Sequence, residues 1–183
     1  MNEIPDHPVY AKSVLELLTV ANDYCVTLGQ AEKINKQKLT DYLLKVLPLL
    51  YLKASLIPSV KARNPEFNER FWTEEEWEAL FNLLRNKFGK DDEFWIVNQA
   101  GSANETIKGS LADHLTDIYQ ALKDFLMLYQ KSSIDSKENA VEEVHSSFIS
   151  HWGTRLVDAH KTLHYLWIEG ISMEEEPETG SFL

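Results

Sequence analysis

Apolar residues recur at steps of three and four along almost the whole chain, which is the spacing of one buried helix face. The first such stretch predicts a helix over residues 9–32. A second helix is expected to begin after Asn35, a favourable N-cap residue, and to end at Pro58. Because its apolar residues surround the helix on all sides, we expect it to be central, with a kink at Pro48.

The segment WTEEEW, residues 72–77, gives the clearest local signal. Thr73 and Glu76 fit a capping box, which predicts a helix that begins at Glu74 and ends at Gly89. Residues 90–109 are less regular, but the apolar run FWIV at 94–97 is unusual for a free loop. We expect this segment to pack over the bundle as a short helical turn.

Two further helices complete the predicted fold. One covers the segment around residues 110–129, and the other begins after Ser136 and continues to about Glu169, with Gly153 as a point of bending. The prediction is an all-α, single-domain, mostly antiparallel bundle of about five main helices with a kinked central helix. Residues 1–170 would form this domain, and residues 171–183 an acidic disordered tail.

Charge and cysteine content narrow the possible functions. The formal net charge of −11 disfavours binding to nucleic acids and to anionic membranes. Cys25 is the single cysteine, so a disulfide framework within the chain is excluded. The longest apolar run, VLPLLYL, is too short to span a bilayer, and the first residues carry no signal-peptide pattern. We therefore expect a cytoplasmic protein.

Three longer motifs suggest a family. The segments LPLLYLKASLIP, LADHLTDIYQALKDF and HWGTRLVDAHKTLH resemble a bacterial all-helical family known as domain of unknown function 5063. The resemblance extends from the first predicted helix to Leu166. It implies an all-α bundle, and it implies no activity, cofactor or catalytic residue.

A row of carboxylates on the fourth predicted helix is the first candidate site. Asp113, Asp117 and Asp124 fall within an arc of about 40° on a helical projection. The row could bind a divalent cation or a ligand, or its members could be ordinary cap and surface charges. Asp117 lies at the edge of the apolar stripe, and Arg155 projects close to the apolar face of the fifth predicted helix. We expect these two residues to form a buried ion pair or to line a small ligand site.

Histidines offer a second candidate site. His160 and His164 are four residues apart, as helical zinc ligands are, and His114 on the neighbouring helix could supply a third ligand. A chance arrangement of core and surface histidines is the alternative. The chain contains no P-loop, dinucleotide-binding or nucleophile-elbow motif, so no cofactor is expected.

The five tryptophans suggest contact with another protein, because not all of them can be buried with a partner for the indole N–H. Trp95 and Trp167 are the residues we expect on an exposed partner surface, although both could instead pack loops onto the bundle. The favoured hypothesis is a non-enzymatic interaction or accessory protein that binds a protein partner or a second copy of itself. The alternative is a metal-dependent or small-ligand enzyme with a His/Asp site between the fourth and fifth helices.

Overall fold

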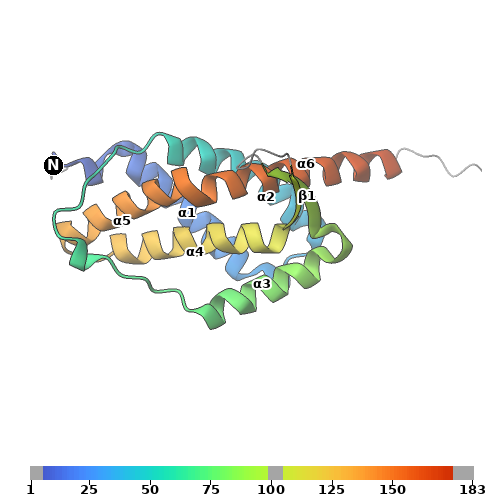
Figure 1. The fold of residues 1–183 in the computed structure, drawn as a ribbon, viewed down its shortest axis with the longest axis horizontal. Helices are drawn as coiled ribbons and strands as arrows, with labels where there is room; N and C mark the ends of the chain where they lie inside the picture. Colours follow the sequence, from blue (N-terminus) through green and yellow to red (C-terminus); the bar gives the residue numbers. More distant parts are fainter. Residues whose placement is uncertain (1–5, 99–104, 175–183) are drawn as a thin grey trace, which may run out of the picture.

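Helices follow one another through most of the computed structural model, which describes residues 6–98 and 105–174 (Figure 1). The main elements are α1 (Lys12–Gly29), α2 (Lys36–Ser55), α3 (Glu74–Phe88), β1 (Glu93–Asn98), β2 (Glu105–Ser110), α4 (Leu111–Tyr129), α5 (Ile134–Ser147) and α6 (Gly153–Glu174). A π-helical turn, Phe148–Trp152, connects α5 to α6. The predicted all-α, single-domain class is confirmed. None of the described helices has the length and hydrophobicity needed to span a membrane.

The centre of the bundle is α4, not α2 as the sequence suggested. α4 packs against α1, α3, α5 and α6, whereas α2 packs mainly on α1 and α6. The apolar ring around α2 is therefore only partly covered, and Leu49, Tyr51 and Leu52 remain exposed. α2 is one continuous helix with Pro48 inside it, as expected.

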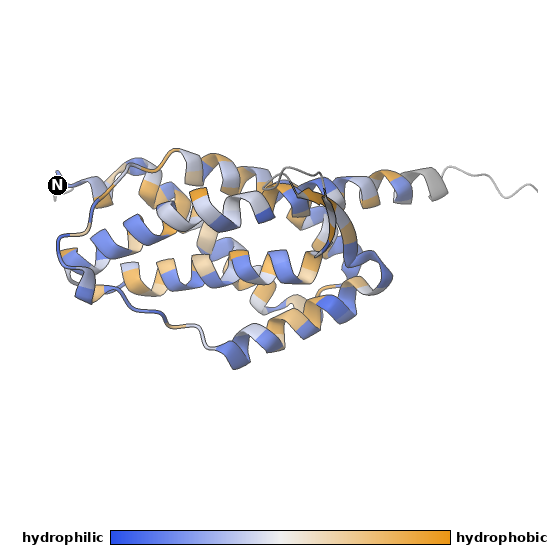
Figure 2. Ribbon diagram, in the orientation of Figure 1, coloured by the Kyte–Doolittle hydropathy of each residue, from blue (hydrophilic) through white to orange (hydrophobic). Residues whose placement is uncertain are grey.

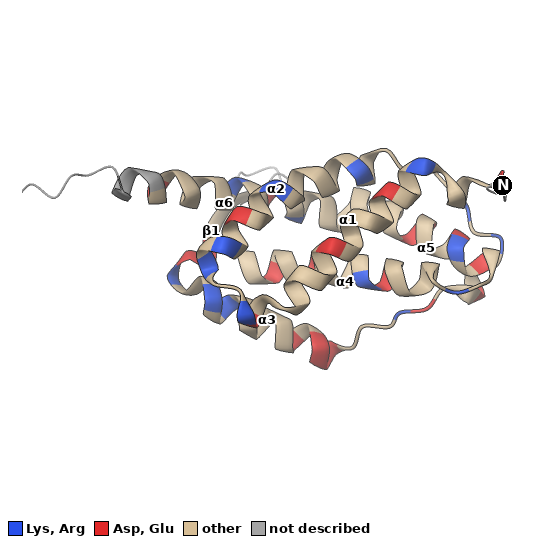
Figure 3. Cartoon of the chain, turned by 180° about the vertical axis from the view of Figure 1, so that it is seen from behind, with Lys and Arg blue, Asp and Glu red and all other residues tan. Residues whose placement is uncertain are grey.

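The helix starts follow the predicted capping chemistry. The Asn35 side chain accepts a hydrogen bond from the Lys38 amide, and α2 begins at the next residue. Thr73 and Glu76 form the reciprocal bonds of a capping box at α3. The first turn of α3 is acidic and its last turn is basic, in agreement with the helix dipole (Figure 3).

Residues 90–109 correct the prediction of a helical turn, because they contain a β-hairpin. β1 and β2 pair in antiparallel register, with Ile96 opposite Ile107 and Phe94 opposite Gly109. The aromatic and β-branched residues at 94–97 favour an extended backbone, and their hydrophobic character stands out at one end of the bundle (Figure 2). A Cβ atom at position 109 would lie 2.7 Å from the side chain of Ile96 and 2.8 Å from the ring of Phe94, so any other residue there would have to displace these side chains.

Asp92 attaches this hairpin to the central helix. Its carboxylate accepts hydrogen bonds of 2.8 Å from the Ala112 amide and the Ser110 hydroxyl, and its carbonyl accepts one from the Leu111 amide. The side chain is almost completely buried, and these three bonds lead to the N-cap and the first turn of α4. Asp92 thereby satisfies free amides of the helix start and fixes the hairpin above it.

The predicted fifth helix is α5, the π turn and α6 in succession. α5 begins earlier than expected, at Ile134, because Ser133 rather than Ser136 supplies the N-cap. The bend expected at Gly153 is the end of the π turn, where the helix is widened by one residue. α6 extends beyond Gly170, into the segment predicted as a tail, and its last turns project from the bundle (Figure 1). The rest of the predicted tail lies outside the described residues.

Candidate functional site

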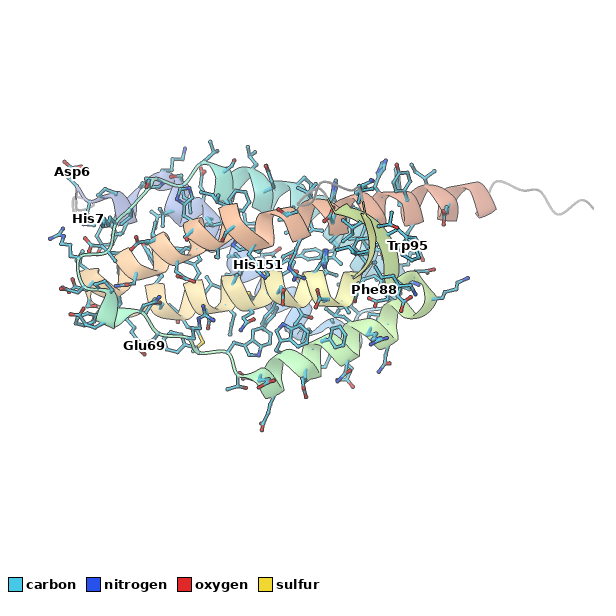
Figure 4. All side chains as sticks on the ribbon, viewed as in Figure 1. Asp6, His7, Glu69, Phe88, Trp95 and His151 are labelled. Carbon is cyan, nitrogen blue, oxygen red and sulfur yellow. The ribbon has the colours of Figure 1, made fainter. Side chains whose placement is uncertain are left out.

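Asp117, in the middle of α4, joins three neighbouring elements. Its Oδ1 accepts a 2.9 Å hydrogen bond from the indole N–H of Trp77 on α3. Its Oδ2 lies 3.1 Å from both Arg155 Nε on α6 and His151 Nε2 in the π turn. Asp117 and Arg155 therefore form an ion pair, and the same carboxylate also contacts Trp77 and His151. Figure 4 shows His151 between α4 and α6.

Arg155 extends this pairing to a second carboxylate. One of its terminal nitrogens donates to Asp113 Oδ2 and lies 3.4 Å from Nδ1 of His114. The hydrogen bond from His114, together with the charge of Arg155, lowers the pKa of Asp113, although partial burial acts in the opposite direction. Two carboxylates thus share one guanidinium.

The row continues to Asp158, one turn further along α6. His114 is almost completely buried, and its Nε2 lies 4.0 Å from Asp158 Oδ2. The ring of Phe94, from β1, meets the imidazole edge-on with centroids 5.3 Å apart. Together the residues form an alternating row of imidazole, carboxylate and guanidinium groups, ordered His151, Asp117, Arg155, Asp113, His114 and Asp158, which we call the polar row.

Most of the polar row borders an open cleft of about 850 Å³, which we call the polar cleft. Its walls are α3, the hairpin, the start of α4 and the first turns of α6. Arg85 and Phe81 from α3 and Ile96 and Ile107 from the hairpin are among the residues that line it. This combination of apolar walls and a polar floor is typical of a small-molecule site.

The third carboxylate of the predicted row has a different role. Asp124 Oδ1 accepts hydrogen bonds from the amides of Phe71 and Trp72, at 2.7 and 3.0 Å. It therefore secures the segment that leads into α3. None of the three aspartates is an isolated surface charge, because Asp113 and Asp117 are held by Arg155.

The structure does not bring the three predicted metal ligands together. His160 Nε2 lies 3.2 Å from the carbonyl oxygen of Leu44 and donates to it, while His164 packs against the ring of Trp167. His114 belongs to the polar row instead. Within residues 6–98 and 105–174, no three His, Cys, Asp or Glu side chains are grouped in a way that could hold a metal ion. Because His160 and His164 are four residues apart, they lie on the same side of α6. That side packs against α2 and not against His114.

Both tryptophans predicted on a partner surface are exposed, but they line different grooves. Trp95 is 68% exposed and borders a groove of about 620 Å³ between β1 and α6, which we call the β1–α6 groove. Trp167 is 47% exposed and borders another groove, formed with the start of α2. The two grooves adjoin, since Lys90, Asp91 and Leu166 line both.

Sequence reasoning missed three members of the site, His151, Asp158 and Trp77. Asp158 follows Arg155 by three residues and thus shares its helix face, a signal that could have been used. His151 lies in the π turn, where ordinary helix spacing does not apply. Trp77 was interpreted only as part of a helix start, and its contact with Asp117 depends on how α3 packs on α4.

The fold and the site define an all-α bundle with a polar cleft beneath a short hairpin. The chain belongs to the family described as Domain of unknown function (DUF5063), whose match covers residues 8–169. It is similar in structure to protein BF1032 from Bacteroides fragilis, with a TM-score of 0.79 and 29% sequence identity. That match covers 97% of this chain and 100% of the other. No curated protein is significantly similar to the chain.

Proposed function

We propose that this protein is a non-enzymatic interaction protein of the cytoplasm, and that it binds an extended segment of a partner protein in the β1–α6 groove. The observation that carries the proposal is the free edge of β1. β1 pairs with β2 alone among the described residues, and the β1–α6 groove is lined by β1 and α6 without any residue of β2. The unpaired edge of β1 therefore faces the groove.

A strand edge of this kind has backbone N–H and C=O groups available for another strand. An extended peptide can add to such an edge, where main-chain hydrogen bonds supply affinity and alternate side chains supply specificity. Five consecutive residues of β1, 93–97, line the groove, so a peptide strand of similar length can pair along it. A helix in the same groove would leave these backbone groups unpaired.

The side chains around the groove indicate what the partner segment would contain. Trp95, Val97 and Tyr165 are exposed along it and suit apolar side chains on the partner. Lys90 and Lys161, on its rim, have no carboxylate within ion-pair distance among the described residues. We therefore expect an extended, largely apolar segment with an acidic residue beside these lysines.

The test is selection from a display library of peptides of about 12 residues, followed by titration of the selected peptides into the labelled full-length protein. We expect NMR shift changes to concentrate in residues 93–97 and 161–166, and Trp95→Ala to weaken binding at least about tenfold. Methylation of alternate backbone amides of the peptide should abolish binding, because strand addition requires those donors.

Trp167→Ala is the matched control, since it removes a similarly exposed indole outside the groove and should leave affinity unchanged. The proposal is wrong if methylated peptides bind equally well, or if Trp167→Ala and not Trp95→Ala weakens binding. It is also wrong if sedimentation reveals a dimer that Trp95→Ala dissociates, because a second copy would then occupy the groove.

A further inference from the structure

Two charged side chains that line the polar cleft, one of each sign, make no ion pair at hydrogen-bond distance with a described residue. The other charged groups of the cleft are paired: Lys108 Nζ lies 2.6 Å from Glu93, Arg155 holds Asp113, and Asp92 caps α4. Asp158 and Arg85 remain.

Asp158 is three-quarters buried at one wall of the cleft. Its nearest ionic neighbour among the described residues is Nε2 of His114, and the 4.0 Å between these atoms is too long for a hydrogen bond. Nδ1 of His114 lies 3.5 Å from Asp113 Oδ2. The same nitrogen lies 3.4 Å from a terminal nitrogen of Arg155, so the close polar contacts of the imidazole are on its Nδ1 side. The Asp158 carboxylate therefore accepts no hydrogen bond of ordinary length from a described side chain.

A primary ammonium group supplies the donor that the Asp158 carboxylate lacks. It carries three N–H donors and a full positive charge, so it can donate to this carboxylate at hydrogen-bond distance. The ring of Phe94 beside His114 shields the position from water on one side. Such a desolvated, charge-assisted contact is stronger than one at an open surface.

Arg85 is the cation that α3 contributes to the lining of the cleft. Its guanidinium packs over the ring of Phe81, 5.7 Å from the centroid, and makes no ion pair with any described residue. The positive charge of Arg85 also lowers the pKa of Glu93, another residue that lines the cleft, although Lys108 has the larger effect. An arginine oriented by an aromatic ring is well suited to a carboxylate.

We propose that the polar cleft binds a small zwitterion of the amino-acid class, with its amine on Asp158 and its carboxylate on Arg85. This ligand neutralises both unpaired charges in one step. The cleft has room for such a molecule and the π turn beside it, a feature that recurs at functional sites, positions the polar row that forms its floor.

The experiment uses the full-length protein and a series of ω-amino acids from glycine to 6-aminohexanoate, titrated by calorimetry. Monoamines and monocarboxylates of equal chain length form the comparison series. We expect at least one ω-amino acid to bind at least about tenfold more tightly than either matched single-charge compound. Asp158→Asn and Arg85→Met should each weaken it by about tenfold or more, while Arg70→Met, at an arginine outside the cleft, should not.

Reversal of one charge separates recognition from a purely structural effect. Arg85→Glu should transfer the preference from ω-amino acids to diamines of similar length, because both walls would then be acidic. Trp95→Ala should leave this binding unchanged, which distinguishes the polar cleft from the β1–α6 groove. The proposal is overturned if no ω-amino acid binds better than its single-charge analogues, or if Arg85→Glu leaves the preference as it was.

Discussion

Replacement of Gly153 by alanine tests whether the π turn is held by packing. A Cβ atom at this position would lie within van der Waals contact distance of the Phe148 carbonyl oxygen and 3.0 Å from two atoms of the Phe148 ring. The ring could rotate away, but the carbonyl belongs to the π turn itself. Gly153→Ala therefore has to displace the backbone that carries His151 toward Asp117.

Two opposite effects determine the size of the change. Alanine in place of glycine inside a helix ordinarily stabilises it by about 1 kcal/mol. An added methyl group in a closely packed position costs about 1–3 kcal/mol, and contact with backbone favours the upper end of that range. We expect a net loss of about 2 kcal/mol in the free energy of unfolding, which lowers Tm by about 4–8 °C in a chain of this size.

Urea unfolding, followed by circular dichroism and tryptophan fluorescence, measures this loss. Gly170→Ala is the matched control, because Gly170 lies in the same helix and a Cβ atom there would meet nothing within 4 Å. That variant should be as stable as the original protein or up to about 1 kcal/mol more stable. If Gly153→Ala is equally stabilising, the packing argument for the π turn is refuted.

Two further predictions concern the polar row. Arg155→Met should lower the free energy of unfolding by about 2 kcal/mol in denaturant titrations, since Asp113 and Asp117 lose their shared cation but remain partly hydrated; unchanged stability would contradict this role. Because His114 and Arg155 lower the pKa of folded Asp113 from its ordinary 3.8, its contribution is present above that pH and is lost as the pH falls through the lower folded value. Stability should accordingly decline less steeply below about pH 4 in Asp113→Asn than in the original protein, and equal slopes would argue against the pairing.

The helical class and the helix starts could be predicted because both depend on local chemistry. Apolar spacing locates a helix, and side chains such as Asn35 and Thr73 define where it begins. The central position of α4 could not be found in this way. Polar residues such as Thr116 interrupt its apolar pattern, but packing against four helices buries Thr116 completely. The apolar residues of α2 are distributed around the whole helix, which suggested a central position, and yet several of them lie at the surface.

The hairpin and the arrangement of the site depended on contacts between distant segments. The run at 94–97 has residues that favour strands, but it needed β2 and the anchor at Asp92 to form one. The pair of Asp117 and Arg155 could be anticipated, because a partly buried arginine requires a carboxylate. His160 could not be placed, because spacing within one helix does not determine which neighbour that face meets.

The π turn also constrains how the length of this chain can change during evolution. The buried residues that approach and follow it are each four positions apart, namely Val144, Phe148, Trp152 and Leu156. In a regular α-helix, each such step would rotate the buried stripe by about 40°, and the additional residue in the turn absorbs that drift. Deletion of a single residue there would restore regular winding and rotate all of α6 by about 100° relative to α5. We therefore expect natural insertions and deletions to accumulate in the linkers and to be excluded from this turn.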